Sequence, residues 1–147
     1  MIDHLFDIRF EPYHYFFAGL IAIFSFLLSN FYFIYPQYDK ILHFFVPIIA
    51  GSFVFHTMRK LKISFKVKLM FTFCIVVSFI GLAEIGEYLL DVFFDLKLQG
   101  VFLRSAGGLE KFDILVSGLD DTMIDMVIGT IGVGIYVLWK RLFGKNH

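Results

Sequence analysis

Cysteine and recognisable catalytic motifs are both scarce in this sequence. Cys74 is the only cysteine among 147 residues, so no disulfide can form within the chain. There is no nucleophile elbow, glycine-rich phosphate loop or HExxH zinc motif, and no internal repeat or low-complexity tract. Basic and acidic side chains balance at 13 each, so net charge gives no reason to expect nucleic acid as a partner. These absences leave neither a disulfide scaffold nor a standard catalytic motif.

What the sequence has in excess is apolar surface. Hydrophobic residues make up 59% of the chain and the mean hydropathy is +0.78. A soluble domain has about 45–50% apolar residues. The excess lies in long runs, and the length leaves room for one domain, residues 1–147. The lipid bilayer is therefore the expected surrounding of most of the chain.

Four runs are long enough to cross a membrane as helices. Crossing the ~30 Å hydrocarbon core takes roughly 20 apolar residues, and a single span satisfies its backbone in lipid only as a helix. The runs cover about residues 15–35, 40–58, 69–94 and 121–139. The first lacks a basic flank and a small-residue cleavage site, so it does not resemble a signal peptide. The predicted fold class is all-α, a polytopic transmembrane four-helix bundle.

Basic residues predict the orientation of these spans. Lysine and arginine cluster after the second span, between residues 59 and 68, and after the fourth, between residues 140 and 145. Such segments stay in the cytoplasm. This predicts cytoplasmic N- and C-termini and a multi-pass protein of the cell (cytoplasmic) membrane. Residues 96–120 then form an outer loop or a lid, with several glycines for turns or hinges.

Acidic side chains occur inside the predicted spans, where each costs about 2.5–3.5 kcal/mol to insert. Asp39 and His43 open the second span, and Asp121 and Asp125 open the fourth; each pair is four residues apart and shares a helix face. The third span carries four acids on one stripe, at spacings of 3, 4 and 4: Glu84, Glu87, Asp91 and Asp95. Three helices are thus each expected to carry a polar stripe.

The predicted orientation puts these stripes at one depth near the outer face. At 1.5 Å per residue, His43 and Asp125 lie about 5–7 Å inside the boundary, and Glu84 roughly 7–9 Å inside. Carboxylates in one layer repel, so protons, Lys40, Arg104 or a bound cation must neutralise them. Carboxylates suit Mg²⁺, Ca²⁺ or Mn²⁺, and an imidazole favours Mn²⁺, Zn²⁺ or Fe. We predict a divalent metal ion (Mg, Mn, Ca or Zn) with these ligands: Asp39, His43, Glu84, Glu87, Asp121 and Asp125.

Simpler interpretations exist for several of these residues. Asp120 and Asp121 suit an N-cap and the first turn of a helix. Asp95 suits the outer interface, and Asp39 suits a turn. His43 on its own would more often be a polar packing residue. The two glutamates of the third span have no such interpretation, because carboxylates within a membrane are functional candidates by default.

The same residues form three motifs: Tyr38-Asp39-Lys40-x-x-His43-Phe44, Glu84-x-x-Glu87 and Asp121-Thr122-x-x-Asp125-Met126. In this order and spacing, over roughly residues 38–135, they resemble the YjdF-type bacterial membrane proteins, whose layout is similar to that of the VanZ-like proteins. That family usually has a Gln-Gly-Asp-Trp-Asp-like run before the last span, where this chain has Ser117-Gly118-Leu119-Asp120-Asp121. The resemblance supports the site and implies no particular reaction.

Three functions fit these features. The first is a metal-dependent enzyme or binder that acts on a lipid or envelope substrate, with Arg104 near an anionic lipid headgroup. The second is a cation- or proton-coupled transporter, although the inner half of the third span offers only Thr72 and Ser78 as hydroxylated steps. The third is a structural or accessory protein in which the metal holds the bundle together. A homo-oligomer is compatible with all three.

Overall fold

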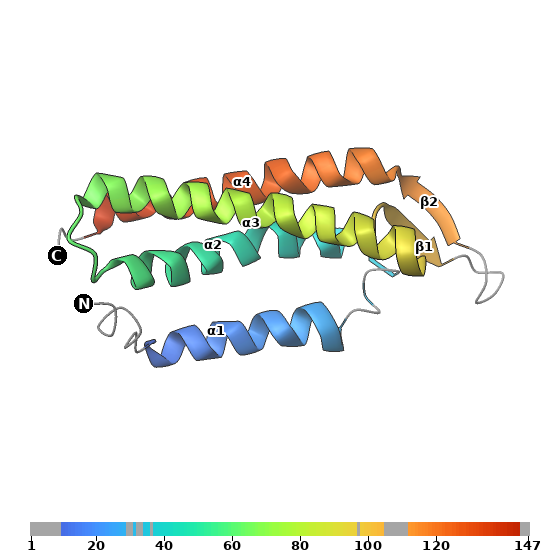
Figure 1. The fold of residues 1–147 in the computed structure, drawn as a ribbon. Coiled ribbons are helices and arrows are strands. Elements are labelled where there is room, and N and C mark those ends of the chain that lie inside the picture. Colours follow the sequence, from blue (N-terminus) through green and yellow to red (C-terminus); the bar gives the residue numbers. More distant parts are fainter. Residues whose placement is uncertain are drawn as a thin grey trace.

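Three long helices form the body of the protein. The computed structural model describes residues 10–28, 31, 34–35, 37–96, 98–104 and 112–144, without the side chains of residues 26, 102–104 and 112–115. Helices α2 (Gln37–Met58), α3 (Phe65–Phe94) and α4 (Gly118–Phe143) lie side by side, as Figure 1 shows. Each is long and apolar enough to cross a membrane, judged by length and composition. The prediction of a helical, multi-pass membrane protein is confirmed to this extent.

The fourth helix is shorter than predicted. The expected first span, residues 15–35, corresponds to α1 (Pro12–Ala22) and the π-helical turn η2 (Ile23–Leu27). Their 11 and five residues give 16 in all, below the roughly 20 that a span requires. Beyond Leu28 the described backbone makes separate turns, since the Phe31 N–H donates to the Leu28 carbonyl. Among the described residues, three candidate spans and one short helix therefore stand where four spans were predicted.

Helix α1 is attached to the bundle by a buried histidine. His14 is only 1% exposed. Its ring lies 4.8 Å from the ring of Phe53 and 4.6 Å from that of His56, centroid to centroid, both on α2. Its Nδ1 atom accepts a hydrogen bond from the Glu11 N–H at 3.2 Å, which completes a capping box at the start of α1. The first turn of α1 is thus fixed against the last turns of α2.

Serine caps place the starts of α3 and α4 earlier than hydropathy alone suggested. The Ser64 hydroxyl accepts from the Val67 N–H at 3.4 Å, and the Ser117 hydroxyl accepts from the Asp120 N–H at 3.3 Å. The Asp120 carboxylate also accepts from the Ser117 hydroxyl at 2.7 Å. Asp120 therefore belongs to the cap of α4, in agreement with its simpler interpretation.

Glycines allow α2 and α4 to approach closely. A Cβ atom added at Gly132 would overlap the backbone carbonyl oxygen of Phe44 on α2, and one added at Gly51 would lie 2.8 Å from the ring of Tyr136 on α4. Small residues are common at such contacts between membrane helices. This close approach brings the start of α2 within side-chain reach of the start of α4.

Helix α2 contains a proline at its centre. Pro47 is buried and lies four residues after His43. A proline has no backbone N–H, so it removes the hydrogen bond to the carbonyl four residues earlier. The His43 carbonyl therefore lacks its usual helical partner. A Cβ atom added at Gly129 of α4 would lie 3.4 Å from this carbonyl oxygen, so α4 passes close to it.

The predicted outer loop or lid contains a β-hairpin. Strands β1 (Val101–Arg104) and β2 (Phe112–Val116) pair antiparallel, with Val101 opposite Val116 and a shift in register after Val101. Figure 1 shows the hairpin at the end of the bundle where α3 ends and α4 begins. Strands this short give a weak hydrophobic pattern, which is why sequence alone suggested only a loop or lid.

Candidate functional site

Lys40 lies at the centre of the acidic cluster. Its ammonium contacts carboxylates from two helices, α2 and α4. Nζ lies 3.1 Å from Asp39 Oδ2, and it lies 2.7 and 2.6 Å from the two carboxylate oxygens of Asp125. It also donates to Asp121 Oδ1. Lys40, one of the candidates considered for neutralisation, thus serves as the counter-charge of the α4 aspartates.

His43 joins this centre to α3. Its Nε2 atom lies 3.5 Å from Asp39 Oδ1, one turn earlier on α2, and its Nδ1 atom lies 3.6 Å from Glu84 Oε1. Glu84 is only 3% exposed, and its Oε1 atom has no hydrogen-bond partner. A buried carboxylate oxygen without a partner is costly, so this position is where a proton or a cation would be most stabilising.

The structure brings five of the six predicted ligands into one layer and separates their roles. Ligand atoms of Asp39, His43 and Asp125 all lie within 4.8 Å of one another, the spacing needed to share a metal ion. Asp121 is instead engaged by Lys40 and by the Gly100 N–H, whose hydrogen bond to Asp121 Oδ2 is 2.8 Å long. The sixth, Glu87, is partly buried along α3, one helical turn beyond Glu84.

The cluster retains a surplus of negative charge. Four carboxylates contact the one lysine or the one histidine of this layer, so a formal surplus of two negative charges remains even when the imidazole is protonated. In an apolar environment such a surplus favours binding of protons or a cation. Lys40 therefore explains part of the neutralisation, and the side around Asp39, His43 and Glu84 is where more positive charge is needed.

The segment before the hairpin is tied to this layer by groups that sequence reasoning missed. The Gln99 amide donates to the Thr122 hydroxyl at 3.0 Å, and the Asp91 carboxylate accepts from the backbone N–H groups of Leu98 and Gln99, both at 2.8 Å. Asp91 lies on the acidic stripe but has this anchoring role. Thr122 belonged to a quoted motif, whereas Gln99 stands in an irregular segment with no pattern to mark it.

An apolar groove opens beside the cluster. Its volume is about 420 Å³, and it lies between η2, α2 and α3. Among the described residues that line it, only Ser25, His43 and Glu87 are polar. The rest are hydrophobic: Leu42, Val46, Pro47, Ala50, Val76, Phe79, Ile80 and Ala83. The groove thus combines a long apolar wall with an ionisable end formed by His43 and Glu87.

Arg104 was predicted to lie near an anionic lipid headgroup. Its backbone is in β1, and its side chain lies outside the described residues. Contact of Arg104 with a headgroup therefore stays a prediction.

The arrangement places an acidic and imidazole donor set at the polar end of an apolar groove. Two carboxylates and one imidazole form a donor set that fits a divalent metal such as Mn²⁺ or Zn²⁺. The carboxylate of Glu84 faces the second nitrogen of the same imidazole, as partners of metal-binding histidines commonly do.

Comparison with known proteins places the chain in a family. No curated protein and no solved structure matches it. A family model described as "Predicted membrane protein (DUF2238)" matches residues 2–146. This agrees with the expected membership of a membrane family, and the YjdF-type and VanZ-like likeness stays a resemblance of motifs. Since the match covers nearly the whole chain, the protein belongs to the DUF2238 family of predicted membrane proteins.

Proposed function

We propose that this protein binds a divalent cation at Asp39, His43 and Asp125 and holds a lipid-like ligand in the adjacent groove. It would do so as a multi-pass protein of the cytoplasmic membrane, with the site near the outer face. When bound, the cation would supply Lewis-acid or electrostatic stabilisation to a polar headgroup. The proposal covers a binder or an enzyme that acts on an amphiphilic envelope substrate.

One observation carries this proposal: His43 belongs both to the group of possible cation ligands, with Asp39 and Asp125, and to the wall of the groove. An amphiphile whose apolar chain lay along Val46 and Phe79 would have its polar group beside His43 and Glu87. Ligand pockets commonly combine apolar walls with a few polar groups that fix orientation. A site used only to hold helices together would not need such an opening.

The residues of the chain have distinct parts in this proposal. Lys40 supplies a counter-charge to Asp121 and Asp125 and holds both side chains in place through its hydrogen bonds. Glu84 would orient His43 by accepting a proton or hydrogen bond from Nδ1. Glu87, at the groove, would contact the polar end of a ligand.

Binding is better supported than transport. Between the cluster and the opposite end of the bundle, the apolar side chains of Val76, Ile80 and Val133 pack into a buried core. A conducting path needs successive polar positions through the membrane. At the depth of these three side chains, the described core offers apolar contacts and not the polar positions that a conducting path needs.

Cation binding is testable with protein purified in neutral detergent. Titration of metal-free protein with Mn²⁺ or Zn²⁺ should show saturable binding of one ion per chain. His43→Ala and Asp125→Asn should each weaken it by at least about 10–100-fold, the range known for loss of supporting contacts around a metal. Elemental analysis measures the number of ions per chain, and isothermal titration calorimetry measures the affinity of the wild type and of each variant.

Asp120→Asn is the matched control, because Asp120 caps the same helix and is exposed. It should bind the ion as the wild type does. Equal metal content in Asp125→Asn and the wild type would rule out the site.

Occupancy of the groove by lipid is tested separately. Ala83 lines the groove on α3, whereas Leu82 is exposed and lies outside it. Ala83→Phe should reduce co-purified lipid to less than half, because the ring fills space that an acyl chain would use, and it should leave metal binding unchanged. Mass spectrometry of extracted lipid measures this, with Leu82→Phe as control. The same lipid content in both variants would contradict the proposal.

A further inference from the structure

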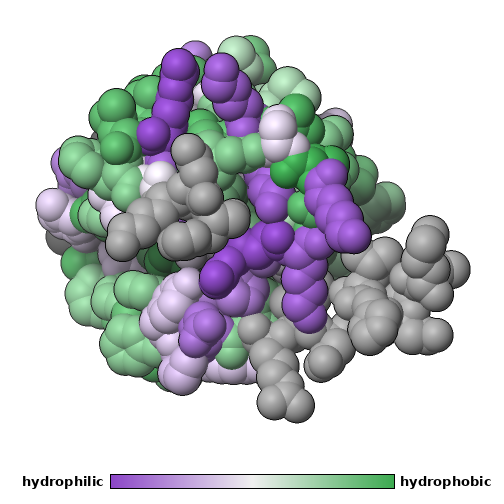
Figure 2. All heavy atoms as spheres, turned by 90° about the vertical axis from the view of Figure 1, so that its left-hand side faces the viewer, coloured by the Kyte–Doolittle hydropathy of each residue, from purple (hydrophilic) through white to green (hydrophobic). Residues whose placement is uncertain are grey.

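A second polar pocket lies at the opposite end of the bundle from Lys40. It has a volume of about 220 Å³ and is lined by residues of all four α-helices and of the turn after α2. Figure 2 shows hydrophilic side chains gathered on this end face, where α2 and α4 end and α3 begins. We call it the basic pocket, after three of its lining residues: His56, Arg59 and Lys140.

The basic pocket gathers the positive charges of Arg59 and Lys140. None of the described lining residues is acidic. Lys140 Nζ lies instead over aromatic faces, 5.2 Å from the ring centroid of Phe55 and 5.3 Å from that of Trp139. The nearby Arg59 charge repels it. Two like charges held together beside apolar rings favour the binding of an anion between them.

The lysine could simply satisfy the end of α4, where basic residues are favourable. In that case its ammonium would reach into solvent, as an exposed terminal lysine does. Lys140 is instead half-buried and lies over Phe55 of the neighbouring helix. This position is better explained by a role inside the pocket.

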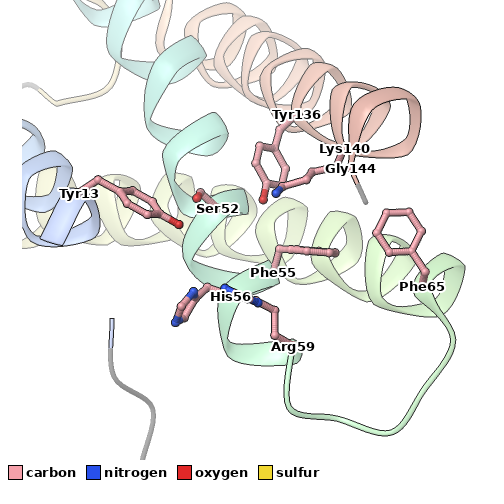
Figure 3. A pocket seen from close by; sticks show the side chains of 9 residues that line it. All are labelled: Tyr13, Ser52, Phe55, His56, Arg59, Phe65, Tyr136, Lys140 and Gly144. Atoms are coloured by element: carbon pink, nitrogen blue, oxygen red, sulfur yellow. The ribbon is translucent and has the colours of Figure 1, made fainter. Parts of the chain in front are cut away.

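Neutral donors complete the lining. Figure 3 shows the Tyr136 hydroxyl beside the Lys140 ammonium, with Ser52 facing them from α2. Phe65, the first residue of α3, also lines the pocket, which places the positive end of that helix dipole at its rim. Behind the pocket, the buried Lys68 donates to the Arg59 carbonyl at 3.0 Å and so fixes the turn that carries the guanidinium.

We propose that the basic pocket binds a phosphate group, either of an anionic lipid or of a soluble phosphate ester. A guanidinium, an ammonium and hydroxyl donors match the several acceptor oxygens of phosphate. Basic pockets between transmembrane helices on the cytoplasmic side are known binding places for anionic headgroups. The proposal does not depend on the cation site, which uses other residues at the other end of the bundle.

Trp139 gives a built-in probe, because it is the only tryptophan and its ring lies against Lys140. Full-length protein in neutral detergent is titrated with inorganic phosphate, and protein in nanodiscs of phosphatidylglycerol is compared with protein in phosphatidylcholine. A saturable change in Trp139 fluorescence with inorganic phosphate identifies a soluble source. A change only with phosphatidylglycerol identifies a headgroup.

Arg59→Gln and Lys140→Gln should each weaken binding at least tenfold, whereas the exposed Lys66→Gln, at the start of α3, should leave it unchanged. An independent measurement uses only the wild type. Its melting temperature should rise with the phosphate species that binds and not with chloride at equal ionic strength. The proposal is overturned by equal effects of Lys66→Gln and Arg59→Gln, by equal stabilisation with chloride, or by no saturable signal from either source.

Discussion

Replacing Lys40 by methionine is expected to cause one of the two largest losses of stability in this protein. Methionine keeps most of the length of the side chain but removes the ammonium that contacts Asp121 and Asp125, whose side chains are only 5% and 3% exposed. Removing one partner of a buried ion pair costs about 3–5 kcal/mol, because the other charge is left uncompensated. The melting temperature in detergent with a chelator should fall by roughly 10 °C or more.

The double variant Lys40→Met/Asp125→Asn separates charge from packing. It removes the stranded carboxylate as well, so it should recover a large part of the lost stability. Divalent cations should also stabilise Lys40→Met more than the wild type, since a bound ion would replace the missing positive charge. If Lys40→Met melts in chelator at the same temperature as the wild type, the lysine is not the counter-charge.

Gly132→Ala is the second substitution with a large expected effect. The added methyl group would overlap the carbonyl oxygen of Phe44, which is backbone and cannot rotate away. Helices α2 and α4 would have to separate, which should cost about 3 kcal/mol, the upper part of the usual range for overpacking. The same separation should move Lys40 away from Asp125 and weaken cation binding.

Gly134 provides a matched control on the same helix. An added Cβ atom there meets nothing within 4 Å, so Gly134→Ala should be neutral or stabilising, because alanine favours a helix more than glycine does. Gly129→Ala should lie between the two, since a Cβ atom added there would lie 2.9 Å from the end of the flexible Ile80 side chain. The melting temperature should be lowest for Gly132→Ala, intermediate for Gly129→Ala and highest for Gly134→Ala. Equal melting of Gly132→Ala and Gly134→Ala would contradict the close approach of α2 and α4.

The sequence predicted the long helices well and the short elements poorly. The three helices of 22, 30 and 26 residues are long and apolar enough to be recognised by hydropathy. The first run differs because η2 interrupts its α-helical hydrogen bonding after Ala22, a change that apolar residues such as Ile23 and Phe24 do not reveal. The hairpin was missed because strands of four and five residues carry little periodicity.

The candidate site was predictable in its residues more than in its connections. Spacing alone put Asp39 with His43 and Asp121 with Asp125 on shared helix faces. Sequence alone does not fix how far each helix is rotated about its axis, so Lys40, next to Asp39, could be named as a neutralising group but not placed at the centre. Gln99 comes from an irregular segment, where no period links sequence to position.

Pro47 makes α2 easier to bend at a point one helical turn from His43 of the acidic cluster. A helix resists bending mainly through its continuous series of backbone hydrogen bonds. In α2 this series lacks the hydrogen bond to the His43 carbonyl. The two halves of α2 can therefore tilt relative to each other more easily than the halves of α3. A ligand that pulls on the imidazole of His43 would act on the residue where the helix yields most readily.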